Sequence, residues 1–187
     1  VIRITLVPII VLVVIFPYAM FDIAIPVYTF DYVSLSLVSI VVLILFVIGS
    51  FTDFLDGYLA RKNNLITTFG KFIDPIADKM LTTTMFIIFA SQGIIPMVAV
   101  IIMVWRDIIV DGIRMVASNE GKVIAAGYLG KIKTVAQILT IIIILLNNLP
   151  FELVGFPMAD FLLWFSVSIS FVSGMSYFLQ SKDFLFK

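Results

Sequence analysis

The sequence predicts an all-α integral membrane protein built as a bundle of six transmembrane helices. Of the 187 residues, 62% are hydrophobic and only 13% are charged, whereas soluble domains are about half apolar and about a quarter charged. The mean hydropathy is +1.20. A membrane span needs about 20 largely apolar residues. Six such stretches are present, at residues 4–21, 33–56, 72–92, 95–116, 132–149 and 159–180.

Each stretch has features of its own. The first follows Arg3 and contains Pro8 and Pro17, and its bulky residues and lack of a small-residue cleavage site distinguish it from a signal peptide. Aspartates lie near the end of the second and near the start of the third, and two arginines interrupt the fourth. The fifth follows a basic connection, and the sixth is rich in serine. The chain opens at Val1, and we expect native residues to precede it.

Charge is distributed unevenly between the connections. The connections after the first and fifth stretches carry only acidic charges, and the short connection after the third carries none. The basic residues in or beside the termini and the other connections are Arg3, Arg61, Lys62, Lys71, Lys122, Lys131, Lys133, Lys182 and Lys187. Because lysine and arginine are retained on the cytoplasmic side, this alternation predicts that both termini are cytoplasmic. Residues 1–187 are predicted to form a single membrane domain.

Composition also excludes several classes of function. Twelve lysines and arginines balance twelve aspartates and glutamates, so nucleic-acid binding, which relies on basic surfaces, is not expected. The chain has no cysteine and no histidine, which excludes disulfides, thiolate nucleophiles and thiolate or imidazole metal ligands. Any chemistry must use carboxylates, amines, guanidiniums, hydroxyls or the backbone.

Two pairs of aspartates lie where the second and third stretches meet. Asp53 and Asp56 are three residues apart, and Asp74 and Asp78 are four apart, so each pair lies on one helical face. Snorkelling beside basic residues accounts for any one of these carboxylates. Four in paired register favour two Mg²⁺ or Mn²⁺ ions, because hard cations prefer clustered oxygen ligands. Such a metal pair is suited to phosphoryl displacement.

The segment 53–78 resembles the signature of the CDP-alcohol phosphatidyltransferase family, D-x2-D-G-x2-A-R-x8-G-x3-D-x3-D. The matching positions are Asp53, Asp56, Gly57, Ala60, Arg61, Gly70, Asp74 and Asp78. This resemblance implies a six-helix membrane enzyme, usually a homodimer, in which an alcohol displaces CMP from a CDP-linked lipid with the help of divalent metal. The basic connections place the acidic motif at the cytoplasmic edge, and the similarity of residues 106–134 to a bacterial branch of the family, described below, implies a bacterial plasma membrane.

The resemblance implies a role for each motif residue. Asp53 and Asp74 would bridge two divalent cations, Asp56 would complete one metal site, and Asp78 would contact the other metal and act as the catalytic base. The residues implied to bind the CDP-lipid are Gly57, Ala60, Arg61, Thr67 and Gly70.

A second polar region lies in the fourth stretch. Arg106 and Arg114 are about two helical turns apart and share nearly the same face. An arginine in an apolar span calls for an anionic partner, and a phosphate suits its planar fork. Local pairing of Arg106 with Asp107 or Asp111 is the alternative. Lysines of the next connection either join this site or only enforce the positive-inside pattern.

This region is similar to the branch of the family that uses glycerol phosphate. Residues 123–126 (V-I-A-A) and 130–134 (G-K-I-K-T) match that branch, while residues 106–107 and 112–114 depart conservatively from its R-E and G-L-R motifs. The resemblance implies CDP-diacylglycerol and sn-glycerol 3-phosphate as substrates. The residues implied to hold the acceptor phosphate are Arg106, Arg114, Lys131 and Lys133. Inositol phosphate, serine or a phospholipid is the alternative acceptor.

A divalent-cation transporter is the rival from another class, because intramembrane carboxylates also line ion paths. Against it, the aspartates lie at one membrane edge, and no acidic residue continues a path through the outer half of the spans. Arg61 and Arg106 would also repel a cation.

Two further patterns concern packing. Aromatic residues near span ends are expected to form interfacial belts, and they include Tyr18, Tyr28, Tyr32, Trp164 and Tyr177. Small residues in the last span predict a close helix contact or a dimer face, at Ser166, Ser168, Ser170, Ser173 and Gly174.

Overall fold

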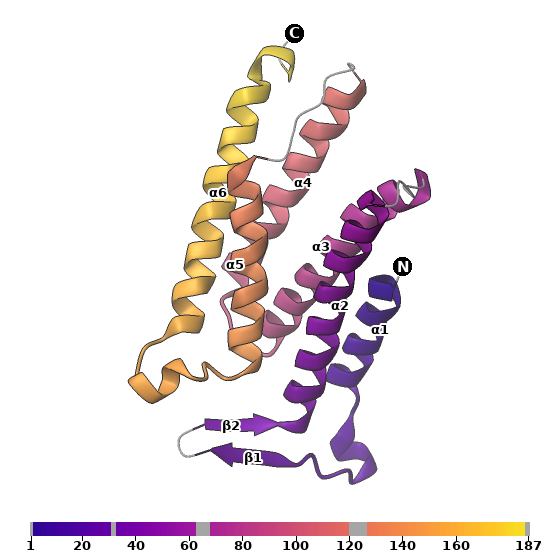
Figure 1. The fold of residues 1–187 in the computed structure, drawn as a ribbon. Helices are drawn as coiled ribbons and strands as arrows, with labels where there is room; N and C mark the ends of the chain where they lie inside the picture. Colours follow the sequence, from indigo (N-terminus) through magenta and orange to yellow (C-terminus); the bar gives the residue numbers. More distant parts are fainter. Residues whose placement is uncertain (1, 31–32, 63–67, 120–126, 186–187) are drawn as a thin grey trace. The chain divides into compact units, whose positions relative to one another are not determined.

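The computed structural model describes residues 2–30, 33–62, 68–119 and 127–185 (Figure 1). The described α-helices are α1 (Ile2–Ile15), α2 (Leu37–Lys62), α3 (Thr68–Ser91), α4 (Met97–Asn119), α5 (Tyr128–Leu145) and α6 (Met158–Leu185). The shorter elements are η1 (Tyr18–Phe21), β1 (Val27–Phe30), β2 (Val33–Ser36) and η2 (Phe151–Val154). Each predicted stretch coincides with one α-helix, with ends shifted by a few residues. The predicted helical class is therefore confirmed for most of the chain.

The connection between α1 and α2 departs from the all-α prediction, because β1 and β2 pair as an antiparallel hairpin. We expected residue 33 to open the second span, but residues 33–36 alternate between apolar and polar. Val33 and Leu35 are buried, as the period-two pattern of a half-buried strand requires. The Oγ atom of Ser36 accepts a 3.1 Å hydrogen bond from the backbone N–H of Ser39. This contact caps the start of α2.

The first helix is shorter than the predicted stretch of residues 4–21. It ends at Ile15, two residues before Pro17, and proline disfavours the helical conformation of the residue that precedes it. The chain continues as η1, and Asp22, the residue directly after it, is in the left-handed conformation with φ 51°. Aspartate visits this region more readily than most residues.

The chain divides into two compact units. The first unit comprises residues 1–88 and 141–157, and in it α1 packs along α2. The side chains of Ile10, Val42 and Phe46 are almost completely buried there. This unit contains the part of α2 and α3 that carries the acidic motif.

The second unit comprises residues 89–140 and 158–187, and in it α4 packs along α6. Thr140 of α5 and Ser166 of α6 are fully buried, and their hydroxyl oxygens lie 3.3 Å apart. The predicted close contact of the serine-bearing face of α6 is therefore an intrachain contact at Ser166.

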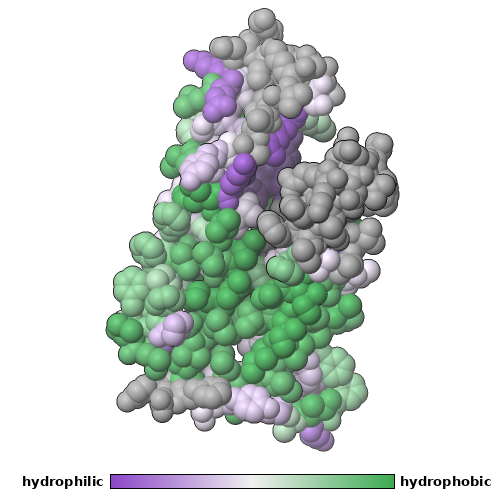
Figure 2. All heavy atoms as spheres, viewed as in Figure 1, coloured by the Kyte–Doolittle hydropathy of each residue, from purple (hydrophilic) through white to green (hydrophobic). Residues whose placement is uncertain are grey.

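Two described helical segments are long and apolar enough to cross a membrane, Tyr128–Leu145 and Met158–Lys182. Shorter apolar segments occur at Arg3–Ile15, Leu37–Thr52 and Lys79–Ser91. Hydrophobic residues cover much of the face seen in Figure 2, and large apolar side chains are exposed on several helices. These observations agree with a membrane protein. The six spans and the cytoplasmic termini stay predictions.

Candidate active site

The acidic motif begins one helical turn beyond a close contact between helices of the first unit. A Cβ atom at Gly49 of α2 would lie 3.1 Å from Cδ2 of Leu81 in α3 and 3.2 Å from Cδ1 of Leu6 in α1. A small residue is therefore needed for α2 to approach both neighbours at this point.

Helical spacing relates this contact to the aspartates. Gly49 precedes Asp53 by four residues, and Leu81 follows Asp78 by three, so each aspartate falls on the same helical face as its neighbour at the contact. The helical register is thus compatible with acidic pairs on facing sides of α2 and α3. The four side chains themselves lie outside the part of the structure that is described in side-chain detail.

The residues predicted to bind the CDP-lipid fall in the same part of the chain. The helix α2 contains Gly57, Ala60 and Arg61, and α3 contains Gly70. The surroundings of their side chains are outside the described detail. Thr67 lies outside the described residues. Among the side chains that are described, no three acidic groups cluster as a metal site. The predicted metal and CDP-lipid residues therefore remain predictions.

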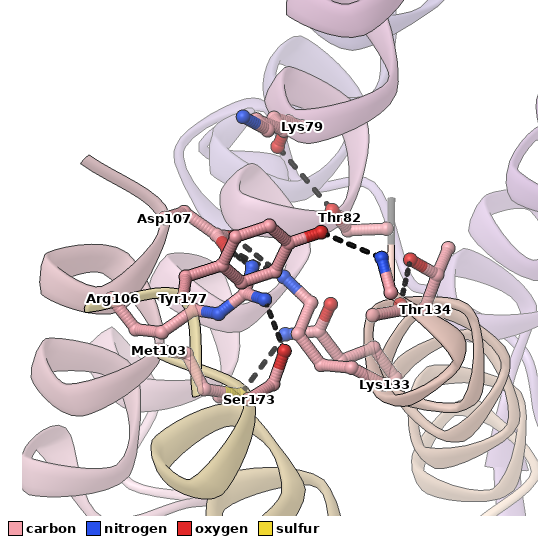
Figure 3. A network of polar contacts seen from close by, with 12 residues as sticks. Lys79, Thr82, Met103, Arg106, Asp107, Lys133, Thr134, Ser173 and Tyr177 are labelled. Atoms are coloured by element: carbon pink, nitrogen blue, oxygen red, sulfur yellow. Dashed lines mark hydrogen bonds and ion pairs between the residues drawn. The ribbon is translucent and has the colours of Figure 1, made fainter. Parts of the chain in front are cut away.

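The predicted phosphate-binding residues lie in the second unit, where buried charges meet (Figure 3). Arg106 of α4 donates a 2.8 Å hydrogen bond from Nη1 to Oδ1 of Asp107. Lys133 of α5 donates from Nζ to both carboxylate oxygens of Asp107, at 2.6 and 2.8 Å. The side chains of Arg106, Asp107 and Lys133 are only 10%, 14% and 7% exposed. One carboxylate therefore neutralises part of the charge of two buried cations, as ion pairs in apolar surroundings require.

Tyr177 of α6 brings the second arginine to the same place. Its hydroxyl oxygen accepts hydrogen bonds from Nη2 of Arg114 at 2.7 Å and from the backbone N–H of Gly127 at 2.8 Å. The guanidinium carbons of Arg106 and Arg114 lie 5.6 and 5.1 Å from the centre of the Tyr177 ring, within the range of cation–π attraction. The predicted shared face of the two arginines is confirmed.

The neighbouring residues of α6 hold Arg106. Its Nη2 atom donates a 2.5 Å hydrogen bond to Oγ of Ser173. A Cβ atom at Gly174 would lie only 2.9 Å from Cγ of Arg106, so glycine makes room for the arginine stem. We call Arg106, Asp107, Arg114, Lys133, Ser173 and Tyr177 the basic cluster.

Several predictions about this region can now be assessed. The local Arg106–Asp107 pairing is present, and Lys133 shares the same carboxylate. Lys131 is exposed, and no recorded contact joins it to the basic cluster in the described part of the chain. Tyr177 is only 4% exposed, so its assignment to an interfacial belt is wrong.

Sequence reasoning missed Tyr177 as a partner of the arginines, although a signal was present. Polar residues recur along α6 at intervals of four, three, four and four residues, which places them on one helical face. All five are buried, and they are Ser166, Ser170, Ser173, Tyr177 and Ser181. A tyrosine that continues such a face points into the protein, with its hydroxyl near other polar groups.

The arginines keep unused donors. Within the described residues, the Nε atoms of Arg106 and Arg114 are buried without a hydrogen-bond partner, which is unfavourable for a polar group. Arg106 also forms part of the wall of a mainly apolar cavity of about 330 Å³ between α4 and α6, together with Trp105, Phe171 and Gly174. The basic cluster thus combines guanidinium groups of incomplete hydrogen bonding with apolar surroundings, an arrangement that favours binding of an anion.

Comparison with known proteins identifies the family of this chain. Residues 1–172 match the family model of the CDP-alcohol phosphatidyltransferases, and the chain belongs to this family. It is 50% identical over 142 residues to the CDP-diacylglycerol–glycerol-3-phosphate 3-phosphatidyltransferase of Bacillus subtilis, covering 76% of this chain and 74% of that protein. It is 32% identical over 158 residues to the protein of the same name from Rickettsia bellii, covering 82% of this chain and 85% of the relative.

Proposed function

We propose that this chain transfers the phosphatidyl group of CDP-diacylglycerol to sn-glycerol 3-phosphate, giving phosphatidylglycerophosphate and CMP in phospholipid biosynthesis. The observation that carries this proposal is the 50% identity to the Bacillus subtilis enzyme, whose name states this reaction. Family membership over residues 1–172 supports the reaction class. The basic cluster supports an acceptor that carries a phosphate.

The donor half of the reaction is assigned to α2 and α3. The donor set of Asp53, Asp56, Asp74 and Asp78 is made of carboxylates alone, which suits Mg²⁺ or Mn²⁺. The approach of α2 to α3 beside Gly49 supports a site shared by the two helices. When bound, two such cations neutralise the diphosphate and the charge that develops on the departing CMP.

The CDP-lipid would lie along the same helices. Gly57, Ala60 and Gly70 lack bulky side chains and would let the nucleotide approach the backbone, while Arg61 and Thr67 would donate hydrogen bonds to it. Asp78 accepts the proton of the primary hydroxyl of sn-glycerol 3-phosphate. The hydroxyl oxygen attacks the phosphorus that carries diacylglycerol, the bond to CMP breaks, and CMP leaves as an anion.

The acceptor half is assigned to the basic cluster and Lys131. The phosphate of sn-glycerol 3-phosphate would bind Arg106 and Arg114, whose guanidinium forks match its oxygens. The Nζ atom of Lys133 donates to both carboxylate oxygens of Asp107. In the proposed complex this ammonium group would interact with the acceptor phosphate as well as with Asp107. Lys131 of α5 is exposed. Its charge would extend the positive potential of the site toward the cytoplasm.

The same features support a location in the bacterial plasma membrane. Two segments of the described chain are apolar and long enough to cross a bilayer. The segregation of basic residues favours six spans with a cytoplasmic active site and termini. The chain is also proposed to form a homodimer, as the family resemblance implies.

The test is a CMP-release assay with the purified full chain in detergent micelles that contain CDP-diacylglycerol. With Mg²⁺ or Mn²⁺, sn-glycerol 3-phosphate should support turnover, and EDTA should abolish it. Inositol phosphate, serine and phosphatidylglycerol serve as rival acceptors. Turnover with one of these and not with sn-glycerol 3-phosphate would overturn the acceptor assignment while leaving the family assignment intact.

A substitution at Asp78 tests its assignment as the catalytic base. Asp78→Asn removes the proposed base and should lower kcat by about 100-fold or more. Asp22→Asn is the matched control, because Asp22 is exposed and asparagine tolerates its left-handed backbone equally well. Near-wild-type turnover by the Asp78→Asn protein would contradict the assignment.

A further inference from the structure

Tyr177 contacts both arginines of the basic cluster in two different ways. Its ring lies within 5.6 Å of the guanidinium carbon of Arg106 and within 5.1 Å of that of Arg114. Its hydroxyl oxygen accepts from Arg114 and from the backbone N–H of Gly127. The tyrosine therefore links α4, α6 and the residue before α5 through one side chain.

These contacts restrict the motion of the arginines. A free arginine side chain occupies many rotamers, and the loss of this freedom on ligand binding weakens affinity. The hydroxyl of Tyr177 fixes the end of Arg114, while Oγ of Ser173 fixes that of Arg106. The two arginine side chains then lose their conformational entropy when the protein folds and not when the ligand binds.

We propose that Tyr177 is a positioning residue of the acceptor site, which orients the guanidinium groups of Arg114 and Arg106 toward the phosphate of the acceptor alcohol. The inference rests on the proposed function, in which these arginines bind that phosphate. Tyr177 acts through the arginines and does not contact the reacting atoms.

The test separates the two substrates kinetically. Tyr177→Phe keeps the ring that faces the guanidinium groups and removes only the hydroxyl. The KM for sn-glycerol 3-phosphate should rise about tenfold, the effect of losing one hydrogen bond to a charged group. The kcat and the KM for CDP-diacylglycerol should change less than about twofold, because the acidic motif is untouched.

A matched control and a property of KM keep this test decisive. Tyr28→Phe makes the same change at a tyrosine of β1 that is 48% exposed, and should leave both KM values unchanged. If Tyr177→Phe lowers the folded fraction, kcat falls in proportion, but the KM of the molecules that remain folded does not. The KM ratio therefore still reports on positioning.

A double-mutant cycle asks whether Tyr177 acts through Arg114. In an Arg114→Lys background the lysine lacks the guanidinium that Tyr177 holds, so adding Tyr177→Phe should raise the KM for sn-glycerol 3-phosphate less than about twofold. Full additivity, an unchanged acceptor KM in the single variant, or equal rises in both KM values would overturn the proposal. A wild-type protein that releases no CMP with sn-glycerol 3-phosphate would instead overturn the proposed function.

Discussion

Two glycines allow close helix contacts in the two units, and their neighbours differ. Gly49 of α2 faces the terminal methyl groups of Leu6 and Leu81, whereas Gly174 of α6 faces the Cγ atom in the middle of the Arg106 side chain. A leucine methyl group can move by a few tenths of an ångström without loss of other contacts. The Arg106 stem cannot, because its far end is bound to Asp107 and Ser173.

The difference shows how packing is related to function in each unit. At Gly49 the contact is apolar, and its effect is on the stability of the α1–α2–α3 packing. At Gly174 the contact sets the place of a charged group that belongs to the proposed acceptor site. A change of one methyl group should therefore affect stability alone in the first case and acceptor binding as well in the second.

The largest effect is expected from Asp107→Asn. The change leaves Arg106 and Lys133 buried without their shared counter-charge, and loss of one partner of a buried ion pair costs about 3 kcal/mol or more. Unfolding of the purified chain in mixed dodecylmaltoside and SDS micelles measures this loss. The exposed Asp22→Asn control should stay within about 0.5 kcal/mol of wild type. Equal stability of the two variants would show that the buried cations do not depend on Asp107.

A smaller effect is expected from Gly174→Ala. The new Cβ atom would meet Cγ of Arg106 at 2.9 Å, and overpacking of this kind costs about 2 kcal/mol. Because Arg106 must move, the KM for sn-glycerol 3-phosphate should rise while that for CDP-diacylglycerol does not. Gly112→Ala in α4 is the matched control, since a Cβ atom there meets nothing within 4 Å among the described residues. If Gly174→Ala and Gly112→Ala had the same KM for sn-glycerol 3-phosphate, the packing at Gly174 would have no effect on acceptor binding.

The smallest effect is expected from Gly49→Ala. The leucine methyl groups at 3.1 and 3.2 Å must yield slightly, and the resulting strain opposes the higher helix propensity of alanine, worth about 1 kcal/mol. The unfolding free energy should therefore stay within about 1 kcal/mol of wild type, with the acceptor KM unchanged. A larger rise in acceptor KM than in Gly174→Ala would reverse the comparison between the two units.

The helices could be predicted from the sequence because their signal is long and local. Six apolar stretches gave six α-helices in the described ranges, and the eight-residue spacing placed Arg106 and Arg114 against one ring. The hairpin was missed because Val33 and Leu35 extend an apolar run that continues into α2. Only the alternation with serine distinguishes a strand from a helix start there.

The partners of the arginines could not be predicted in the same way. The Arg106–Asp107 contact joins adjacent residues and was foreseen as an alternative, but the contacts to Ser173 and Tyr177 join residues more than 60 positions apart. Spacing within one helix cannot reveal which helices pack together. The aspartates of α2 and α3 stay predictions for a different reason, because their side chains lie outside the described detail.

The sharing of Asp107 between two cations has a consequence for the choice of acceptor. Among the described side chains of the basic cluster, three are cationic and Asp107 is a carboxylate, so these four groups together carry a formal charge of +2. A phosphate monoester carries close to two negative charges at neutral pH and would bring the site to electrical balance. A zwitterion such as serine would leave both charges uncompensated in a poorly hydrated region, where that imbalance is costly. The charge of the basic cluster thus favours an acceptor that carries a phosphate, whatever the shape of its alcohol.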